Sequence, residues 1–283
     1  MFWNMFVVEN QKLFKRAIVW VELAVVGVAI LAVNLMMFVI TRVETGNPMI
    51  DMLEETLVWP GALTQAAGLA SGASLGGILI IILTGAAMAQ EYTWRTLQLW
   101  LSRGVPRSLF LTAKFAALLL PALLLVVVPL VLGGLVTAVF SQIILGEIPF
   151  AAVEWGNVFL LTLATAYSLL PYAGLAFFLA VATRSTMITI GGGLAYTLLI
   201  EGLAVQILAL AGGSLAAIGK YVPAGLVQSM LGVGSAVNLE IDGQMGLTVQ
   251  YLEPGAAAVG IALYTIAFVA LSVLIFRRQD LGG

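Results

Sequence analysis

The sequence predicts an all-α integral membrane protein with six transmembrane helices. Hydrophobic residues make up 61% of the 283 residues and charged residues only 9%, whereas a soluble globular domain has roughly 25% charged residues. Several charge-free intervals also exceed the about 20 residues that suffice to cross a hydrocarbon layer about 30 Å thick. Together these observations exclude a soluble domain.

Six apolar runs give the expected spans. The first run follows Lys12, Lys15 and Arg16 and lacks a small-residue cleavage site, so we expect a permanent anchor rather than a cleaved signal. The fifth run follows a short break at Arg184. The expected spans cover about residues 17–40, 69–90, 115–140, 158–183, 187–210 and 256–276. We expect them to form a single domain, 1–283.

Prolines and glycines mark irregular points within these runs. Pro121, Pro129 and Pro171 lie inside the third and fourth spans and are expected to kink them. The glycine run 191–193 opens the fifth span, where small residues allow helices to approach closely.

Positive charges determine the expected orientation, because Lys and Arg are retained on the cytoplasmic side of a membrane. With both termini inside, ten of the twelve cations fall on inner segments. These ten are Lys12, Lys15, Arg16, Arg95, Arg103, Arg107, Lys114, Arg184, Arg277 and Arg278. Only Arg42 and Lys220 fall outside. We therefore expect a multi-pass protein of the cell membrane with both termini in the cytoplasm.

Two polar segments flank or separate the spans. Residues 1–16 mix aromatic and charged side chains, a pattern suited to a helix lying in the membrane plane but also shared by ordinary basic anchors. The external segment 212–255 is long enough for one or two short helices, and residues 221–227 within it are apolar enough to enter the membrane interface.

The composition argues against enzymatic chemistry in this chain. The absence of Cys and His removes the commonest metal ligands and the commonest general base. The Gly219-Lys220 pair is followed by Tyr221 and lacks the P-loop pattern, and no G-x-S-x-G motif is present. We expect no enzyme activity, cofactor or metal site in the chain itself.

The segment 91–114 is the one long polar interval in which cations outnumber anions. Its ionisable residues are Glu91, Arg95, Arg103, Arg107 and Lys114, a net charge of +3. Leu97, Trp100 and Leu101 recur at helical spacing and form one apolar face, and Gly104 follows as a helix-ending residue. The pattern predicts a short amphipathic helix on the cytoplasmic surface.

Five short groups of residues in this segment carry a resemblance to a known family pattern: Glu91-Tyr92, Thr96, Leu101-Ser102-Arg103, Val105-Pro106-Arg107 and Ala113-Lys114. They resemble the E-Y-x-x-G-T, L-x-x-R-P-V-S-R and A-K pattern of ABC-2 type transporter permeases. The chain departs from that pattern at Arg95, where the family often has Gly, and at Gly104, where it often has Pro.

The resemblance implies an exporter subunit that forms a translocation path as a homodimer. It implies an interfacial N-terminal helix, a coupling helix between spans two and three, and short re-entrant helices before span six. Two copies of a separate ATPase subunit would bind ATP and Mg, and no nucleic acid is involved. The residues carried over to the ATPase contact are Glu91, Arg95, Thr96, Arg103 and Arg107. Alternatively, the arginines only enforce topology.

Two ionisable residues lie within the expected spans. Glu22 is five residues beyond Ala17 and is expected to reach the interface or pair with a neighbouring Arg. Glu201 is 14 residues beyond Met187, about 21 Å along a helix. We expect Glu201 to line a substrate path or a subunit interface, or to be a protonated carboxyl bonded to another span.

Two other functions fit the sequence. A secondary carrier would use Glu201 and Glu22 as proton or ion sites and would transport without an ATPase, although no internal repeat is evident. A non-transporting membrane scaffold would bind the ATPase without substrate-dependent hydrolysis.

Overall fold

The computed structural model describes residues 1–43, 48–94, 96–102, 104–148, 150, 153–203, 207, 210, 218–232 and 251–279. Every regular element in this part of the chain is helical. The elements are α1 (Phe2–Phe14), α2 (Ala17–Val43), α3 (Pro48–Leu57), α4 (Gly61–Ala70), α5 (Leu75–Thr93), α6 (Thr96–Ser102), α7 (Arg107–Ala117), α8 (Leu119–Ile144), α9 (Trp155–Ser168), α10 (Leu170–Thr183), α11 (Thr186–Ala195), the π-helical turn η2 (Tyr196–Glu201), α14 (Pro223–Leu231) and α16 (Pro254–Arg278).

Five helical stretches in the described residues are long and apolar enough to cross a membrane. They are Ala17–Val43, Gly61–Thr93, Arg107–Ile144, Trp155–Thr183 and Pro254–Arg278. Large apolar side chains on their outward faces, among them Leu135 and Ile266, remain exposed. Such faces are stable when lipid covers them. The chain is therefore a multi-pass helical membrane protein.

The expected span 187–210 is seen as a shorter apolar helix. Here α11 continues directly into η2, and together they cover Thr186–Glu201. Residues 204–206 and 208–209 lie outside the described part of the chain. A total of six spans therefore stays a prediction.

The helical stretch Gly61–Thr93 is interrupted. The helix α4 ends at Ala70 and α5 begins at Leu75, whereas the sequence predicts a span over 69–90. The intervening residue Gly72 has no room for a side chain, because a Cβ there would collide with the carbonyl oxygen of Ser168. A glycine is thus needed where the break packs against the end of α9.

Prolines account for two further interruptions. Leu118 separates α7 from α8 three residues before Pro121, and Leu169 separates α9 from α10 two residues before Pro171. A proline ring clashes with the carbonyl four residues earlier in a continuous helix, so each break relieves that clash. Pro129 lies inside α8 without interrupting it.

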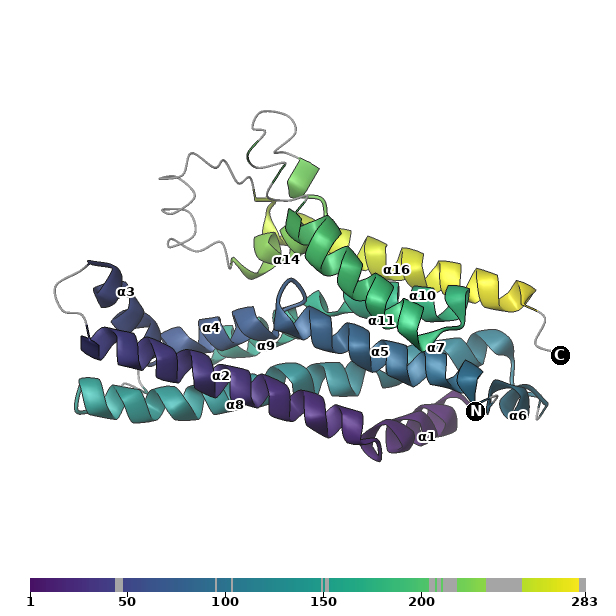
Figure 1. Ribbon diagram of the computed structural model, residues 1–283, viewed down its shortest axis with the longest axis horizontal. Coiled ribbons are helices and arrows are strands. Elements are labelled where there is room, and N and C mark those ends of the chain that lie inside the picture. The colour runs from purple at the N-terminus through teal and green to yellow at the C-terminus, as the bar shows by residue number, and fades with distance from the viewer. Residues whose placement is uncertain are drawn as a thin grey trace.

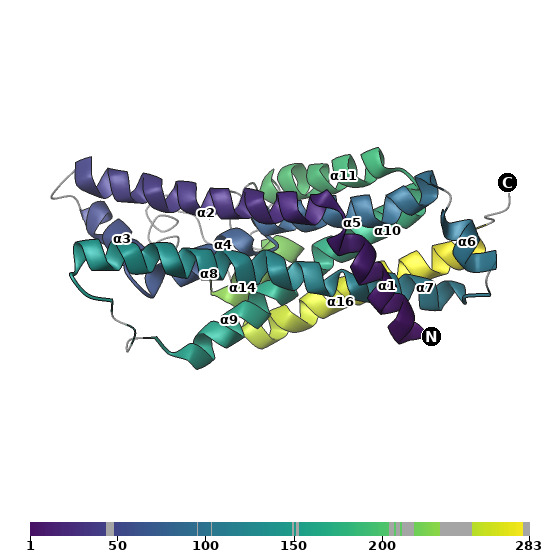
Figure 2. The same ribbon diagram turned by 90° about the horizontal axis from the view of Figure 1, so that it is seen from below.

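The long helices run along one common axis (Figure 1). The helix α2 packs along α8, and α10 packs against α5, α11 and α16. The N-terminal helix α1 lies obliquely across one end of the bundle, the end that also holds α6 and the last turn of α16 (Figure 2). We call this the α6 end. The short helix α14 lies before α16 and packs against it.

Candidate functional site

The predicted amphipathic helix is present at the α6 end as α6, from Thr96 to Ser102. Leu97 on its apolar face is buried, and Trp100 is half-buried. Gly104 follows with φ of +77°, a conformation that glycine adopts without steric cost. Proline could not adopt this positive φ, because the pyrrolidine ring fixes φ at about −65°. This conformation is compatible with the departure from the family pattern at this position.

A group of four charged residues lies directly behind α6. These residues, Glu9 and Lys12 of α1, Glu91 of α5 and Lys114 of α7, form what we call the lysine–glutamate cluster. The Nζ of Lys114 lies 2.6 Å from Oε2 of Glu9 and 2.8 Å from Oε1 of Glu91. The Nζ of Lys12 lies 2.7 Å from Oε1 of Glu9. Two cations and two anions leave the cluster without net charge.

The cluster is buried at its centre. Relative exposure is 2% for Glu9, 2% for Glu91 and 3% for Lys114. Charges at such depth are tolerated only when they are paired and hydrogen-bonded. The ion pairs therefore hold α1, α5 and α7 together where the three helices meet.

The same cluster is joined to α6. The hydroxyl of Thr96, the first residue of α6, donates to the carboxylate of Glu91. The Nζ of Lys12 lies 4.8 Å from the centroid of the Trp100 ring, within the range of a cation–π interaction. The predicted coupling residues Glu91 and Thr96 thus contact each other and anchor α6 to its neighbours.

Arg107 makes a second anchor at the α6 end. Its Nη1 donates to the carbonyl oxygens of Phe276 at 3.3 Å, Arg277 at 3.1 Å and Gln279 at 2.7 Å. The last carbonyls of a helix have no partner within the helix, and a cation there also interacts favourably with the helix dipole. Arg107 therefore holds the C-terminal end of α16 against the start of α7.

Gln279 extends this anchor to two more helices. Its Oε1 accepts a hydrogen bond from the hydroxyl of Tyr92 at 3.1 Å, and its Nε2 donates to the carbonyl of Val181 at 2.7 Å. Tyr92 belongs to α5 and Val181 to α10. Five motif residues of the segment thus make internal bonds around the base of α6: Glu91, Tyr92, Thr96, Arg107 and Lys114.

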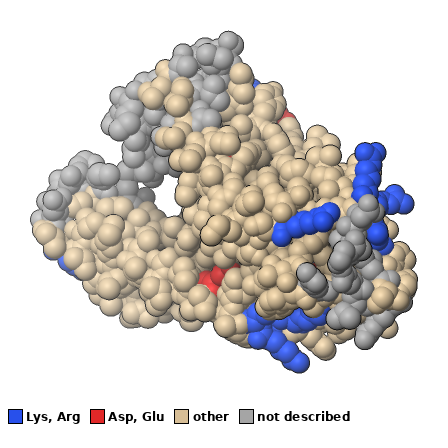
Figure 3. Space-filling view, turned by 45° about the vertical axis from the view of Figure 1, so that its right-hand side comes forward, with Lys and Arg blue, Asp and Glu red and all other residues tan. Residues whose placement is uncertain are grey.

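Arg95 and Arg103, the two other predicted coupling residues, lie outside the described residues. Nearby, Trp94 at the end of α5 is 60% exposed. The guanidinium of Arg16 lies 5.4 Å from the centroid of the Trp94 ring. It also donates a hydrogen bond to Oε1 of Gln90 at 3.0 Å. Lys and Arg side chains gather over this end of the molecule (Figure 3). An exposed aromatic side chain among cations is suited to binding a protein partner.

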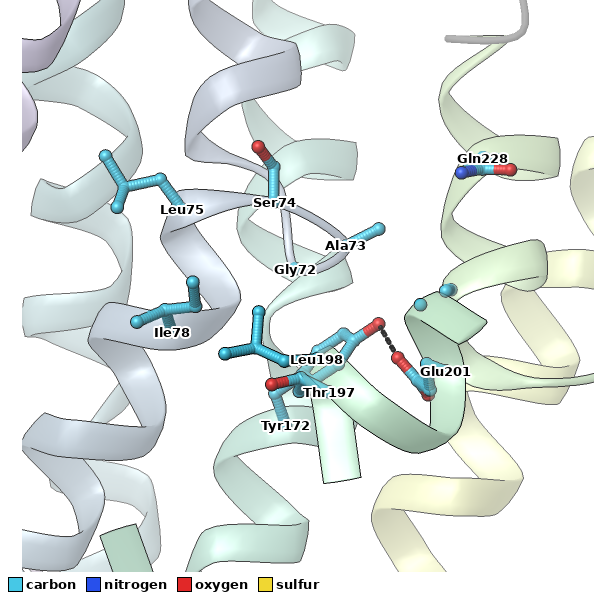
Figure 4. A pocket seen from close by; sticks show the side chains of 12 residues that line it. Gly72, Ala73, Ser74, Leu75, Ile78, Tyr172, Thr197, Leu198, Glu201 and Gln228 are labelled. Carbon is cyan, nitrogen blue, oxygen red and sulfur yellow. Dashed lines mark hydrogen bonds between the residues drawn. The ribbon is translucent and has the colours of Figure 1, made fainter. Parts of the chain in front are cut away.

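A second site lies inside the helical bundle. A cavity of about 420 Å³ is lined by residues of the α4–α5 break, α10, η2 and α14, among them Gly72, Tyr172, Glu201 and Gln228. Glu201 is 4% exposed. Its Oε2 accepts a hydrogen bond from the hydroxyl of Tyr172 at 2.8 Å (Figure 4). Its Oε1 has no hydrogen-bond partner among the described residues.

Further polar groups approach this carboxyl. Tyr196 and the backbone amide of Ala224 lie close to Glu201, although neither meets the geometry of a hydrogen bond to Oε1. The burial of Glu201 agrees with the depth expected from the sequence. The sequence alone gave no indication of Tyr172, which the fold brings to Glu201 from 29 residues away.

Glu22 differs from Glu201 in its surroundings. It is 3% exposed, and neither carboxyl oxygen has a hydrogen-bond partner among the described residues. The expected arginine partner is therefore not found there, and the side chain does not reach the surface. Glu22 is also not among the residues that line the Glu201 cavity.

Sequence reasoning missed the pairing of Lys114 with the N-terminal helix α1. Glu9 and Lys114 are 105 residues apart, so only the fold shows that they pair. The three-residue spacing of Glu9 and Lys12 within α1 was an available signal, because side chains at this spacing lie on one helix face.

The chain matches a protein family over most of its length. Residues 73–282, roughly three quarters of the chain, match the model of a family described as "Protein of unknown function (DUF2705)". No curated protein matches the sequence. The matched range includes α6, Arg107, Lys114 and, apart from Gly72, the described residues that line the Glu201 cavity.

Proposed function

The chain belongs to the DUF2705 family of proteins of unknown function, and we propose that it is the transmembrane subunit of an ATP-driven exporter of the ABC-2 type. In this proposal two copies form the translocation path, and two separate ATPase subunits bind ATP and Mg. The α6 end faces the cytoplasm of the cell membrane, with both termini on that side.

The lysine–glutamate cluster is the observation that carries the proposal. A helix that receives force from an ATPase needs a rigid connection to the spans that must move. Buried ion pairs join α1, α5 and α7 to one another, and the Thr96 hydroxyl joins α6 to this cluster through Glu91. Arg107 connects the start of α7 to the end of α16. A displacement of α6 would therefore be passed to several spans together.

The proposal assigns separate roles to the motif residues. Glu91, Thr96 and Arg107 position the coupling helix from within, because they are engaged in internal bonds. Direct contact with the ATPase then falls on the exposed Trp94 and on the cations Arg95 and Arg103 of the segment. In this division of roles the charged motif does more than enforce topology.

The test is co-expression with a candidate ATPase that carries Walker motifs and is encoded beside this chain, followed by purification in detergent. We expect a stable complex whose formation is lost in Arg103→Glu. Arg278→Glu is the matched control, because Arg278 is an exposed cation at the same end but outside the coupling segment. Arg107→Glu is unsuitable because it would also release α16.

The unpartnered oxygen of Glu201 favours a secondary carrier as the second candidate function, since intramembrane acids often serve as ion or proton sites. Reconstituted vesicles separate the two candidates. A carrier would transport in the absence of nucleotide and ATPase, and that result would overturn the exporter proposal.

A further inference from the structure

We propose that the Glu201 cavity binds an amphipathic organic cation, with an ammonium group paired to the Glu201 carboxylate and an apolar part along the cavity wall. The binding itself is independent of the ATPase. The additional statement that such a cation is transported rests on the proposed function.

The charge balance of the cavity points to a cationic ligand. Glu201 is 4% exposed, and its Oε1 has no partner among the described residues. The described residues that line the cavity include no Lys or Arg. A carboxyl buried in this way either takes up a proton or is stabilised as a carboxylate by a counter-charge. An anionic ligand would add to the unbalanced charge and is excluded.

The hydrogen bond from Tyr172 determines which oxygen of Glu201 is left for a ligand. The Tyr172 hydroxyl donates to Oε2 at 2.8 Å, which favours the ionised acceptor form of Glu201 and leaves Oε1 for another donor. An ammonium group has three N–H donors and no acceptor. Its donors complement Oε1, and Ser74 and Gln228 supply further polar groups on the cavity lining.

The remaining lining selects an organic cation over a metal ion. Ca²⁺ takes six to eight oxygen ligands and Mg²⁺ needs near-ideal octahedral geometry, whereas Glu201 is the one carboxylate among the described residues that line this cavity. Leu75, Ile78 and Leu198 provide apolar walls, with Leu198 beside Tyr172 and with Leu75 and Ile78 on α5 farther from Glu201 (Figure 4). A volume of about 420 Å³ lies in the range of small-molecule pockets. These features fit a cation with an alkyl or aromatic part.

The experiment measures binding of tritiated octylammonium to the purified chain in lipid nanodiscs, with 1-octanol as the neutral competitor of the same chain length. We expect saturable binding that excess unlabelled octylammonium displaces and that 1-octanol displaces at least about tenfold less effectively. Glu201→Gln should weaken binding by about tenfold or more. Glu22→Gln is the matched control, since it changes an equally buried carboxyl outside the cavity, and should bind as the wild type does.

A second measurement needs no variant. A hydrophobic carbodiimide modifies buried carboxyls, and mass spectrometry quantifies modification at Glu201 and Glu22 separately in the wild-type chain. Octylammonium should slow modification of Glu201 and leave Glu22 unchanged. Equal slowing at both positions, absence of saturable binding, or wild-type affinity in Glu201→Gln would each overturn the site. No ATPase is present in either assay, so failure to co-purify with an ATPase would count against the proposed function alone.

Discussion

The Nζ of Lys114 lies 2.8 Å from Oε1 of Glu91 at the base of α6, and both side chains are almost completely buried. Glu91 is the first residue of the segment 91–114, and Lys114, 23 residues further along the chain, is its last. This ion pair therefore holds the two ends of the segment together at the base of α6. The second carboxylate on Lys114, from Glu9, attaches α1 to the same point.

Removal of the Lys114 charge should destabilise the protein strongly. Lys114→Met leaves two carboxylates with only the partly exposed Lys12 as partner. Loss of one partner from a buried ion pair typically costs about 3–5 kcal/mol. We expect a loss of this size in the free energy of unfolding, measured by denaturation in detergent.

Two further variants test the cause of that loss. Adding Glu91→Gln to Lys114→Met should recover most of the stability, because Glu9 and Lys12 remain as a neutral pair. Lys15→Met removes an exposed cation of the same region and should change stability by less than about 0.5 kcal/mol. A double variant no more stable than the single one would contradict the ion-pair explanation.

Arg107→Ala should loosen the C-terminal turn of α16. The substitution removes three hydrogen bonds from the guanidinium to carbonyls of that turn, and bonds to a charged donor contribute about 1.5–3 kcal/mol. Hydrogen–deuterium exchange of residues 276–279 should become about tenfold faster or more. Arg278→Ala removes an exposed charge of the same turn and should leave exchange unchanged. Similar acceleration in both variants would indicate a charge effect rather than capping.

Close packing of α11 on α5 predicts opposite effects at two neighbouring glycines. A Cβ at Gly193 would lie 2.6 Å from Cγ2 of Ile81, whereas a Cβ at Gly191 would have no atom within 4 Å. Gly193→Ala should destabilise by about 1–3 kcal/mol, and Gly191→Ala should be neutral or stabilise by up to about 1 kcal/mol. Unfolding in detergent measures both. If the methyl contact is responsible, Ile81→Ala and Gly193→Ala together should cost less than the sum of the two single losses.

Trp94 should contribute to ATPase binding without contributing to the fold. Its ring is 60% exposed at the α6 end, and aromatic residues are frequent hot spots of protein interfaces, with losses of about 2 kcal/mol or more on truncation. Trp94→Ala should therefore weaken ATPase affinity by about thirtyfold, measured by titration in detergent. Trp155 is equally exposed, at 60%, but lies at the start of α9, so Trp155→Ala is the matched control. Equal effects of the two substitutions would remove Trp94 from the interface.

The helical class and the amphipathic α6 could be predicted from the sequence, because run length and the spacing of Leu97 and Trp100 are local properties. The break between α4 and α5 was only partly visible. Ser71 to Ser74 provide turn-forming residues inside an apolar run, but the position of Gly72 depends on the carbonyl of Ser168, which is distant in sequence.

In the candidate sites, likewise, the sequence identified individual residues but not their partners. Charge counting identified Glu91, Arg107 and Glu201 as residues of interest. Their partners could not be predicted, because Arg107 bonds to carbonyls of α16 about 170 residues away and Glu201 bonds to Tyr172 of another helix. Burial of Glu22 without a partner could not be predicted either, since depth along a helix does not determine which face points inward.

The π-helical turn from Tyr196 to Glu201 makes the direction of the Glu201 side chain depend on the number of residues in that turn. Hydrogen bonds of a π-helix span one residue more than those of an α-helix, and each residue of an α-helix rotates the side chain by about 100°. If the same residues formed an α-helical turn, the acid would be rotated toward a different face, and deletion of one residue at the same time would return it. Substitutions that convert this turn to an α-helix at constant length should therefore move Glu201 away from Tyr172.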